Sequence, residues 1–453
     1  MSKISNKFIF ITTLLTIILN ANYSIVKSHR VPSRIDKMPR NIIEDSSEIP
    51  QNLSYYAYQA KPLSAKKQRK LDYEYNKKYF SPWNLKRFDK SFKDISWAIR
   101  SVEKHKIYNS KYKLIKSSVY DKWIKNSNYE NINSVKKYAI TIKHSNIHAF
   151  PMSQSYYYDP KKTGEGFPFD YNQNSSYHIN TPLFVSHYSL DKKWAFVRGS
   201  TAYGWISTAN IALVSKKFIQ NFKNNRYSIV IKDNLRLMND NKSVSIVKLG
   251  SIFPRGKYKD DNNSIREGYL FASKDRSGQA ILEIATINQN NLIAKKPIAF
   301  TPSNIARVAK ELIDEPYGWG GLLEARDCSS MTKDYFSLFG IFLRRNSNKQ
   351  AQDGKSKSIR KYKKWQKKRV IISKAKPFRS LLYVKGHIVL YIGEYRGEPI
   401  IMHTYWGTRL KDGSKYILGR TLISTTEPAK ELKNIKESSK LINTLSNIIT
   451  FGD

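Results

Sequence analysis

The periodicity of apolar residues changes twice along this chain, and these changes limit the folds that it can adopt. Residues 52–131 have a basic, helical texture, short alternating segments separated by turn residues follow from about Val135, and helical spacing returns from Pro302. A chain of 453 residues is also too long for one hydrophobic core. We therefore expect a multidomain α+β protein in which helical and strand-rich segments form separate domains.

The strand-rich part divides into two sets of similar length. Residues 136–215 and 224–298 each contain several short strands, such as "KKWAFVRG" in the first set and "RYSIVIKD" in the second. Each set has the length of a small β-barrel. We expect two such barrels in tandem, with residues 52–131 as a small helical segment packed on the larger body.

The N-terminus resembles a signal for export. Lys3 and Lys7 precede an apolar run, Phe8 to Leu19, which has the length of a signal-peptide core and is short for a membrane span. We expect a signal peptide over residues 1–24, with an uncleaved anchor as the alternative, followed by a polar linker over 25–51. No second long apolar run follows, so we expect no transmembrane span after signal cleavage.

The chain carries a large excess of positive charge. Lysine and arginine number 79 against 36 aspartate and glutamate residues, which gives a formal net charge of +43. Such a field attracts polyanions, among them nucleic acids, anionic lipid head groups and acidic cell-wall polymers. The alternative is a coding bias toward lysine on a solvated surface. Charge alone therefore names no partner.

Cys328 is the only cysteine of the chain. Exported domains use cysteines in disulfide pairs, so a single one is an inert buried residue, an intermolecular link or a free nucleophile. It opens a helical pattern that runs through Phe339 to Gly340. In the first turn of a helix, the helix dipole lowers the pKa of a thiol and favours the nucleophilic thiolate.

Two histidines follow on a pair of strands. "KGHIVLYIG" carries His387 and "PIIMHTYWG" carries His403, and the connection "EYRGE" has the length of a hairpin loop. Such a strand pair would present both imidazoles side by side, where a base would activate the thiol. The alternative for each histidine is a hydrogen-bonded residue of the core or of a sheet edge. Helices followed by strands make residues 302–430 an α+β domain, with a tail over 431–453.

Four motifs in this domain carry a family resemblance. "YGWGGLLEARDCSSM" resembles the Y-x-W-G-G and D-C-S-G signature of the NlpC-type peptidoglycan peptidases, which are papain-like cysteine enzymes. "LRRNSNKQ" is similar to their L-P-R-x-S-x-x-Q segment, and "GHIVLYIG" and "IIMHTYWG" are similar to their two following strands. The upstream regions resemble the multidomain subgroup with an N-terminal stabilising segment and two bacterial SH3 domains.

The resemblance implies a Cys-His-His catalytic site. Cys328 matches the nucleophile, His387 the general base, and His403 the third residue, which orients the imidazole and favours its charged form. Tyr317 matches a tyrosine that assists the oxyanion site, where the backbone N–H of Cys328 would also contribute.

Further positions are implied to bind the substrate. Asp327 and Ser329 match residues that shape the substrate pocket. Relatives that demand a free N-terminal L-alanine carry an acidic residue and a serine where this chain has Asn346 and Ser347, and asparagine cannot pair with an ammonium charge. In those relatives the first SH3 domain closes that end of the groove, and Tyr203 is our candidate from that side.

The chain departs from the family pattern at several positions. Ser330 replaces the glycine after D-C-S, and Arg344 replaces the proline of L-P-R. Residues 354–378 form a long and very basic insert, which we interpret as a solvated loop or, alternatively, as a contact for anionic wall polymer.

These implications define the expected function. The resemblance implies a monomeric, exported cysteine peptidase of the periplasm or cell wall that cleaves a bond next to D-glutamate in peptidoglycan stem peptides, without metal or cofactor. The first alternative is a catalytically inactive protein that binds cell wall through tandem SH3 domains. The second, an exported nucleic-acid binder, lacks any motif of that class, and we expect no nucleic acid partner.

Overall fold

The computed structural model describes residues 18–452, and residues 1–17 and 453 lie outside it. Most of the predicted signal peptide, residues 1–24, therefore lies outside the described residues. Its predicted end falls inside a strand that begins at Tyr23, so cleavage after residue 24 would remove the start of that strand. Within residues 18–452, no helix is both long enough and apolar enough to cross a bilayer.

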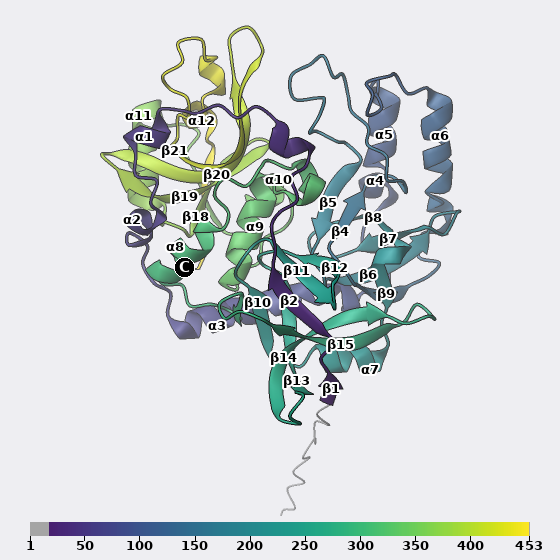
Figure 1. The fold of residues 1–453 in the computed structure, drawn as a ribbon. Coiled ribbons are helices and arrows are strands. Elements are labelled where there is room, and N and C mark those ends of the chain that lie inside the picture. The colour runs from purple at the N-terminus through teal and green to yellow at the C-terminus, as the bar shows by residue number, and fades with distance from the viewer. Residues whose placement is uncertain (1–17, 453) are drawn as a thin grey trace, which may run out of the picture.

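Three β-sheets, with helices between and around them, form the molecule (Figure 1). The first and third sheets lie beside each other in this view, and the second lies below them. Helices and strands follow one another in separate segments of the chain, as expected for a multidomain α+β protein.

The first sheet has the strand order β5-β4-β8-β7-β6-β3-β9. Its core consists of alternating apolar residues that are fully buried, such as Leu183, Val185 and Val197. Its strands are β3 (Lys137–Thr141), β4 (Ser145–His148), β5 (Gln173–Tyr177), β6 (Pro182–Tyr188), β7 (Trp194–Arg198), β8 (Tyr203–Ser207) and β9 (Ile211–Leu213). The long connection from β4 to β5 extends toward the third sheet.

The second sheet follows after α7 (Lys216–Phe222). Its strands from this region are β10 (Tyr227–Val230), β11 (Leu235–Asn239), β12 (Lys242–Val247), β13 (Ile252–Lys259), β14 (Ile265–Lys274), β15 (Ala280–Ile287) and β16 (Ile293–Lys295). Two strands from the N-terminus complete it, β1 (Ile18–Asn20) and β2 (Tyr23–Lys27).

The start of the predicted linker, residues 25–51, is a strand and needs correction. β2 lies between β11, to which it is antiparallel, and β15, to which it is parallel. Ile25 in β2 is completely buried. A five-residue strand in a polar stretch gives little periodicity, and its partners are more than two hundred residues away, so the sequence did not reveal it.

The third sheet has the order β17-β22-β18-β19-β20-β21. Its strands are β17 (Lys355–Ser358), β18 (Ser380–Val384), β19 (His387–Tyr395), β20 (Glu398–Arg409), β21 (Lys415–Thr425) and β22 (Asn447–Thr450). Its helices are α8 (Pro302–Lys310), α9 (Cys328–Leu338), α10 (Ser347–Gln350), α11 (Lys364–Lys374) and α12 (Leu441–Thr444). α9 packs against β19 and β20.

Two predicted boundaries of this domain change. The predicted tail, residues 431–453, contributes α12 and also β22, which lies between β17 and β18 with Ile449 fully buried. The basic insert, residues 354–378, is not a loop, because it forms the exposed edge strand β17 and the helix α11. β17 and β22 form by pairing with residues far away in the chain, and local sequence patterns do not reveal such pairing.

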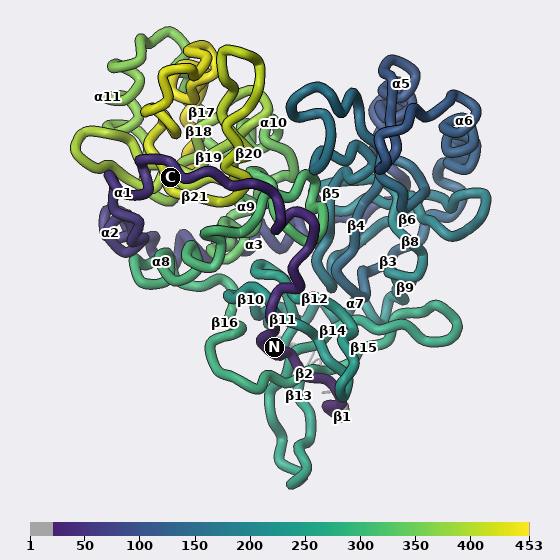
Figure 2. The backbone as a smooth tube through the Cα atoms, turned by 45° about the horizontal axis from the view of Figure 1, so that its top comes forward, coloured from purple at the N-terminus to yellow at the C-terminus, as the bar shows by residue number. Residues whose placement is uncertain are grey.

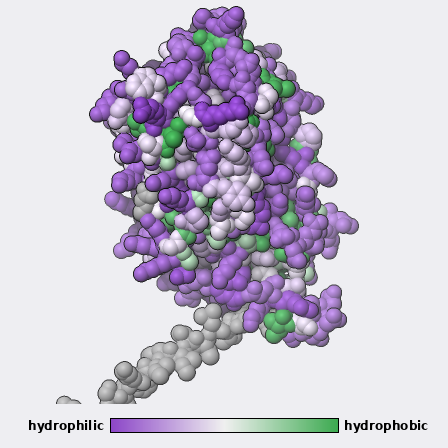
Figure 3. Space-filling model, turned by 90° about the vertical axis from the view of Figure 1, so that its left-hand side faces the viewer, coloured by the Kyte–Doolittle hydropathy of each residue, from purple (hydrophilic) through white to green (hydrophobic). Residues whose placement is uncertain are grey.

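The N-terminal region connects the sheets. Its helices are α1 (Asp45–Glu48), α2 (Leu53–Ala57), α3 (Ala65–Tyr79), α4 (Phe92–Ile95), α5 (Trp97–Lys104) and α6 (Ser117–Asn126). Before α1, the chain runs from the second sheet across to the third (Figure 2), where Asn41 N–H donates to the Ile417 carbonyl at 2.9 Å. The side of the molecule that carries α1, α2 and α11 is mostly hydrophilic, with small scattered apolar patches (Figure 3).

Candidate active site

Cys328 is the first residue of α9. Asp327 caps the helix, since its Oδ1 accepts from Ser330 N–H at 2.8 Å while Ser330 Oγ accepts from Asp327 N–H at 2.9 Å. This reciprocal capping box fixes the point at which the helix starts. Ser330, which stands where the family pattern has glycine, is thus used to hold Cys328 at the helix N-terminus.

Burial overrides the expected effect of the helix dipole on Cys328. The side chain is 7% exposed, and desolvation together with the Asp327 carboxylate raises the pKa of the thiol to about 12. The expectation of a lowered pKa is therefore wrong for the free protein. A weaker opposing effect comes from the backbone N–H of Ile388, whose hydrogen bond lowers the pKa. At neutral pH, Cys328 needs a base to become a nucleophile.

His387 and His403 lie next to each other on adjacent strands, β19 and β20. Nε2 of His387 is 3.1 Å from Nδ1 of His403. Desolvation lowers the pKa of His387 to about 4 and that of His403 well below its usual value, so both rings are neutral at pH 7. The Cys328 thiol contacts the backbone N–H of the residue that follows His387, whose imidazole is neutral.

Ser424 on β21 continues the chain of hydrogen bonds and determines its direction. Its Oγ donates to the Thr425 carbonyl at 2.8 Å, so it accepts a proton from Nε2 of His403 at 3.1 Å. Nδ1 of neutral His403 then accepts from Nε2 of His387. This leaves Nδ1 of His387 without a proton and able to receive one. The hydrogen positions follow from the bonding network.

For the peptidase activity that the family resemblance implies, replacing Ser424 with alanine is expected to lower kcat by about 10- to 100-fold with little change in KM. Without the hydroxyl, Nε2–H of His403 has no acceptor, and reversing both tautomers would protonate Nδ1 of His387. Ser424→Thr keeps the hydroxyl and is the control. The idea fails if kcat is the same for alanine and threonine, measured in steady-state assays with both variants folded.

Tyr405 covers the two imidazoles. Its ring stacks on His403 with 4.8 Å between centroids and lies 5.1 Å from the His387 centroid. A flat apolar neighbour of this kind restricts ring rotation and excludes water. No sequence motif pointed to Tyr405 or Ser424, although Tyr405 lies two residues after His403 on the same strand and so shares its face.

Tyr317 lies close to Cys328 inside an aromatic cluster. Burial, followed by the charges of Cys328 and Asp327, raises the pKa of Tyr317 well above its usual value, so its hydroxyl keeps its proton. Its ring centroid is 6.0 Å from Phe169 and 5.7 Å from Trp406. Phe169 comes from the long β4–β5 connection of the first sheet, which the sequence analysis did not connect with the site.

Asp327 and Ser329 are held by Arg345. The guanidinium bonds the Asp327 carboxylate at 2.7 and 3.0 Å and donates to Ser329 Oγ at 2.9 Å and to Ser175 Oγ at 3.0 Å. Burial opposes ionisation of Asp327, but Arg345 holds its pKa below the usual value. Asp327 and Ser329 thus orient the start of α9 and attach it to β5 of the first sheet.

Gly320 allows the first sheet to come close to this segment. It has φ 63° and its N–H donates to Asp327 Oδ2 at 3.1 Å, while its carbonyl accepts from Gln173 Nε2 at 3.1 Å. A Cβ atom at Gly320 would lie 2.3 Å from the Gln173 carbonyl oxygen. Glycine is needed here because of both the left-handed backbone and this approach.

Three further predicted positions lie outside this cluster. The Tyr203 hydroxyl donates to the Asp94 carbonyl at 2.8 Å and its ring packs on Phe88, so it faces the N-terminal helices and not Cys328. Our assignment of Tyr203 to the substrate groove therefore needs correction. Asn346 is exposed and caps α10, accepting from Lys349 N–H at 2.9 Å, and Ser347 begins that helix.

A buried ionic cluster fixes α9 relative to both other sheets. Arg326 contacts Asp233 at 2.5 Å, Glu315 at 2.8 Å and Asp334 at 2.7 Å, and Asp334 is 3.1 Å from His178 of the first sheet. Breaking such a buried network leaves uncompensated charge, so it specifies one arrangement.

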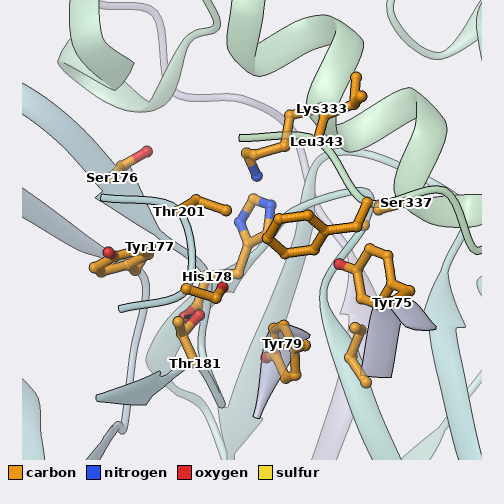
Figure 4. A pocket seen from close by; sticks show the side chains of 14 residues that line it. Tyr75, Tyr79, Ser176, Tyr177, His178, Thr181, Thr201, Lys333, Ser337 and Leu343 are labelled. Carbon is orange, nitrogen blue, oxygen red and sulfur yellow. Dashed lines mark hydrogen bonds between the residues drawn. The ribbon is translucent and has the colours of Figure 1, made fainter. Parts of the chain in front are cut away.

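The cavity next to His178 is small. About 30 Å³ lie between α3, the first sheet and α9 (Figure 4), which is room for water and not for a peptide. Within residues 18–452, no group of three or more histidine, cysteine, aspartate or glutamate side chains is arranged to hold a metal ion.

Three family models match the chain in order. The N-terminal stabilising domain of NlpC/P60 proteins matches residues 11–131, an SH3 domain of the SH3b1 type matches 156–207, and the NlpC/P60 family matches 314–414. Residues 224–298 lie outside these matches, so the second SH3 domain stays a prediction. A search of curated proteins finds no match.

Comparison with solved structures supports the fold. An NlpC/P60 endopeptidase from Photobacterium damselae subsp. piscicida matches with a TM-score of 0.80 and 24% identity over 91% of this chain and 99% of that one. An NlpC/P60 family protein from Bacillus cereus is 12% identical over 70% of this chain and 100% of that one, with a TM-score of 0.40. By its three family-model matches, the chain carries an NlpC/P60 domain preceded by the N-terminal stabilising domain of such proteins and by an SH3 domain.

Proposed function

We propose that this protein is a cysteine peptidase that hydrolyses peptidoglycan stem peptides at a bond next to D-glutamate. The observation that supports this most directly is that Cys328 starts α9 with its thiol bonded by the N–H of Ile388, the residue after His387, while His387 lies beside His403 on β19 and β20. The NlpC/P60 match agrees with this reaction class, and the structurally similar Photobacterium protein is itself an endopeptidase. We further propose that the protein acts as a monomer after export, in the periplasm or at the cell wall.

The proposed mechanism begins with a neutral Cys328 thiol and a neutral His387 imidazole. As Sγ of Cys328 attacks the scissile carbonyl carbon, the thiol proton passes to Nδ1 of His387, which the hydrogen bond to His403 keeps available. The resulting imidazolium gives that proton to the leaving amine, and a thioester with Cys328 remains. Water, deprotonated by His387, then hydrolyses the thioester and regenerates the thiol.

Oxyanion stabilisation comes from the same segment in this proposal. The backbone N–H of Cys328 is one of the unpaired donors of the first turn of α9, and the protonated Tyr317 hydroxyl is the second donor. Arg345 acts as a positioning residue, because it holds the helix start through Asp327.

Isolated muropeptides test this proposal. We expect the purified protein to release a new amine from stem peptides containing D-glutamate, with mass spectrometry locating the cut next to that residue. If no amine appears while the protein still sediments with purified sacculi, the chain is an inactive cell-wall-binding protein. A cut at a bond remote from D-glutamate would support the proposed peptidase activity but contradict the proposed specificity.

A further inference from the structure

A cavity of about 890 Å³ opens at Gly386, the residue before His387. Its walls come from the start of α10, from the turn between β18 and β19, from Arg360 after β17, and from residues 443–446 at the end of α12. The volume lies in the range of small-molecule binding pockets. Two of these walls belong to the basic insert and to the C-terminal segment.

Two walls of the cavity are connected to the candidate catalytic residues. Gly386 in its wall directly precedes His387. The α10 wall is attached to α9, since Gln350 donates to the carbonyl of Ser329 at 2.7 Å, one residue after Cys328. A substrate whose scissile bond lies at Cys328 would therefore have this cavity close to the residues that flank that bond.

The cavity carries unneutralised positive charge. Arg360 and Lys385 are exposed, and neither side chain forms a hydrogen bond or ion pair with any residue of the described range 18–452. A third cation, Lys367, is already occupied by the carbonyls of Ile442, Asn443 and Leu445 at 2.8–3.1 Å. All lining residues belong to the described part of the chain, and none of them is acidic.

We propose that this cavity binds a carboxylate of the substrate next to the scissile bond. Arg360 and Lys385 supply two free cations, and the Ser347 hydroxyl supplies a neutral hydrogen-bond donor. A protonated amine would be repelled by the positive charges of Arg360 and Lys385, and it would lose its hydration without a compensating partner. This inference rests on the proposed peptidase function, and it adds that stem peptides with free carboxylates are preferred over amidated ones.

The double variant Arg360→Gln/Lys385→Gln tests the cavity. For a stem peptide with free carboxylates, we expect its KM to rise about five- to tenfold with kcat nearly unchanged. For the same peptide with these carboxylates amidated, we expect no change. Lys357→Gln is the matched control, because Lys357 is an exposed cation of the same insert on β17 but does not line the cavity.

Binding without turnover separates this inference from the proposed function. Calorimetry compares the affinity of Cys328→Ala for the two peptides, with and without the substitutions at Arg360 and Lys385. Tighter binding of the carboxylate peptide that disappears in the triple variant supports the cavity even if the wild-type protein cleaves neither peptide. Equal affinity for both peptides, or equal KM for wild type and double variant, overturns the inference while leaving cleavage itself untouched.

Discussion

Replacing Cys328 with alanine is expected to lower kcat/KM for stem-peptide cleavage by at least about 10⁴-fold. The variant has no nucleophile, and no other cysteine exists in the chain to replace it. His387 and His403 stay in place but have no thiol to deprotonate. The measurement is the initial rate of amine release from purified muropeptides, with wild-type and variant protein at equal concentration.

The alanine variant is also expected to remain folded. Cys328 is buried, but alanine is smaller and a good helix former, so the cost is limited to the contacts of the sulfur, including those with the N–H groups of Ile388 and Ser329. Equal circular dichroism spectra and similar unfolding midpoints would separate loss of chemistry from loss of structure. Cleavage by Cys328→Ala at a rate close to that of the wild type would show that another residue attacks the peptide bond, and the mechanism would be wrong.

The protein is expected to lose most of its stability between pH 6.5 and pH 4. Desolvation lowers the pKa of His148, His187 and His387 from 6.5 to about 4. Below pH 6.5 these residues gain protons in the unfolded chain but not in the folded protein, so the free energy of unfolding falls as pH falls. Each histidine accounts for about 3 kcal/mol by pH 4.

One carboxylate opposes this loss. Burial raises the pKa of Asp45 to about 6, so the folded protein binds its proton first and gains about 3 kcal/mol over part of the same range. The net change of about 6 kcal/mol from these four groups is comparable to the whole stability of many domains. Denaturant titrations at pH 7 and pH 4.5, followed by circular dichroism, measure it.

His187→Gln is a useful control for this pH effect. It removes one titrating group from the buried core of the first sheet. The fall in the free energy of unfolding on acidification should therefore become smaller by the contribution of one histidine. An unfolding free energy that is the same at pH 7 and pH 4.5 in the wild type would contradict the prediction. Activity profiles below pH 5 should be interpreted only after this measurement.

The central part of the candidate site could be predicted from local sequence. The helix start at Cys328 depends on Asp327 and Ser330, which are its chain neighbours, and the two histidines lie on consecutive hairpin strands. Such features need contacts over a few residues or one short loop, and these are what periodicity and motifs report.

Residues that depend on remote partners were missed or misplaced. Ser424 reaches His403 through the register of β20 and β21, and Arg345 links Asp327 to Ser175 of the first sheet. Tyr203 was assigned to the wrong face, because the orientation of a small sheet relative to its neighbour is set by packing between domains. β2 and β22 were not recognised for the same reason.

The positions of β2 and β22 have a consequence for how the protein is made. β2 is made before its partners, β11 and β15, which follow more than two hundred residues later, and β22 is made after both of its partners, β17 and β18. The second sheet therefore cannot close until β15 has been made, and the third is complete only once β22 has been made. Until then both have open edges that attract other chains. Folding of the nascent chain therefore requires that these open strand edges stay unpaired with other chains until the missing strand has been made.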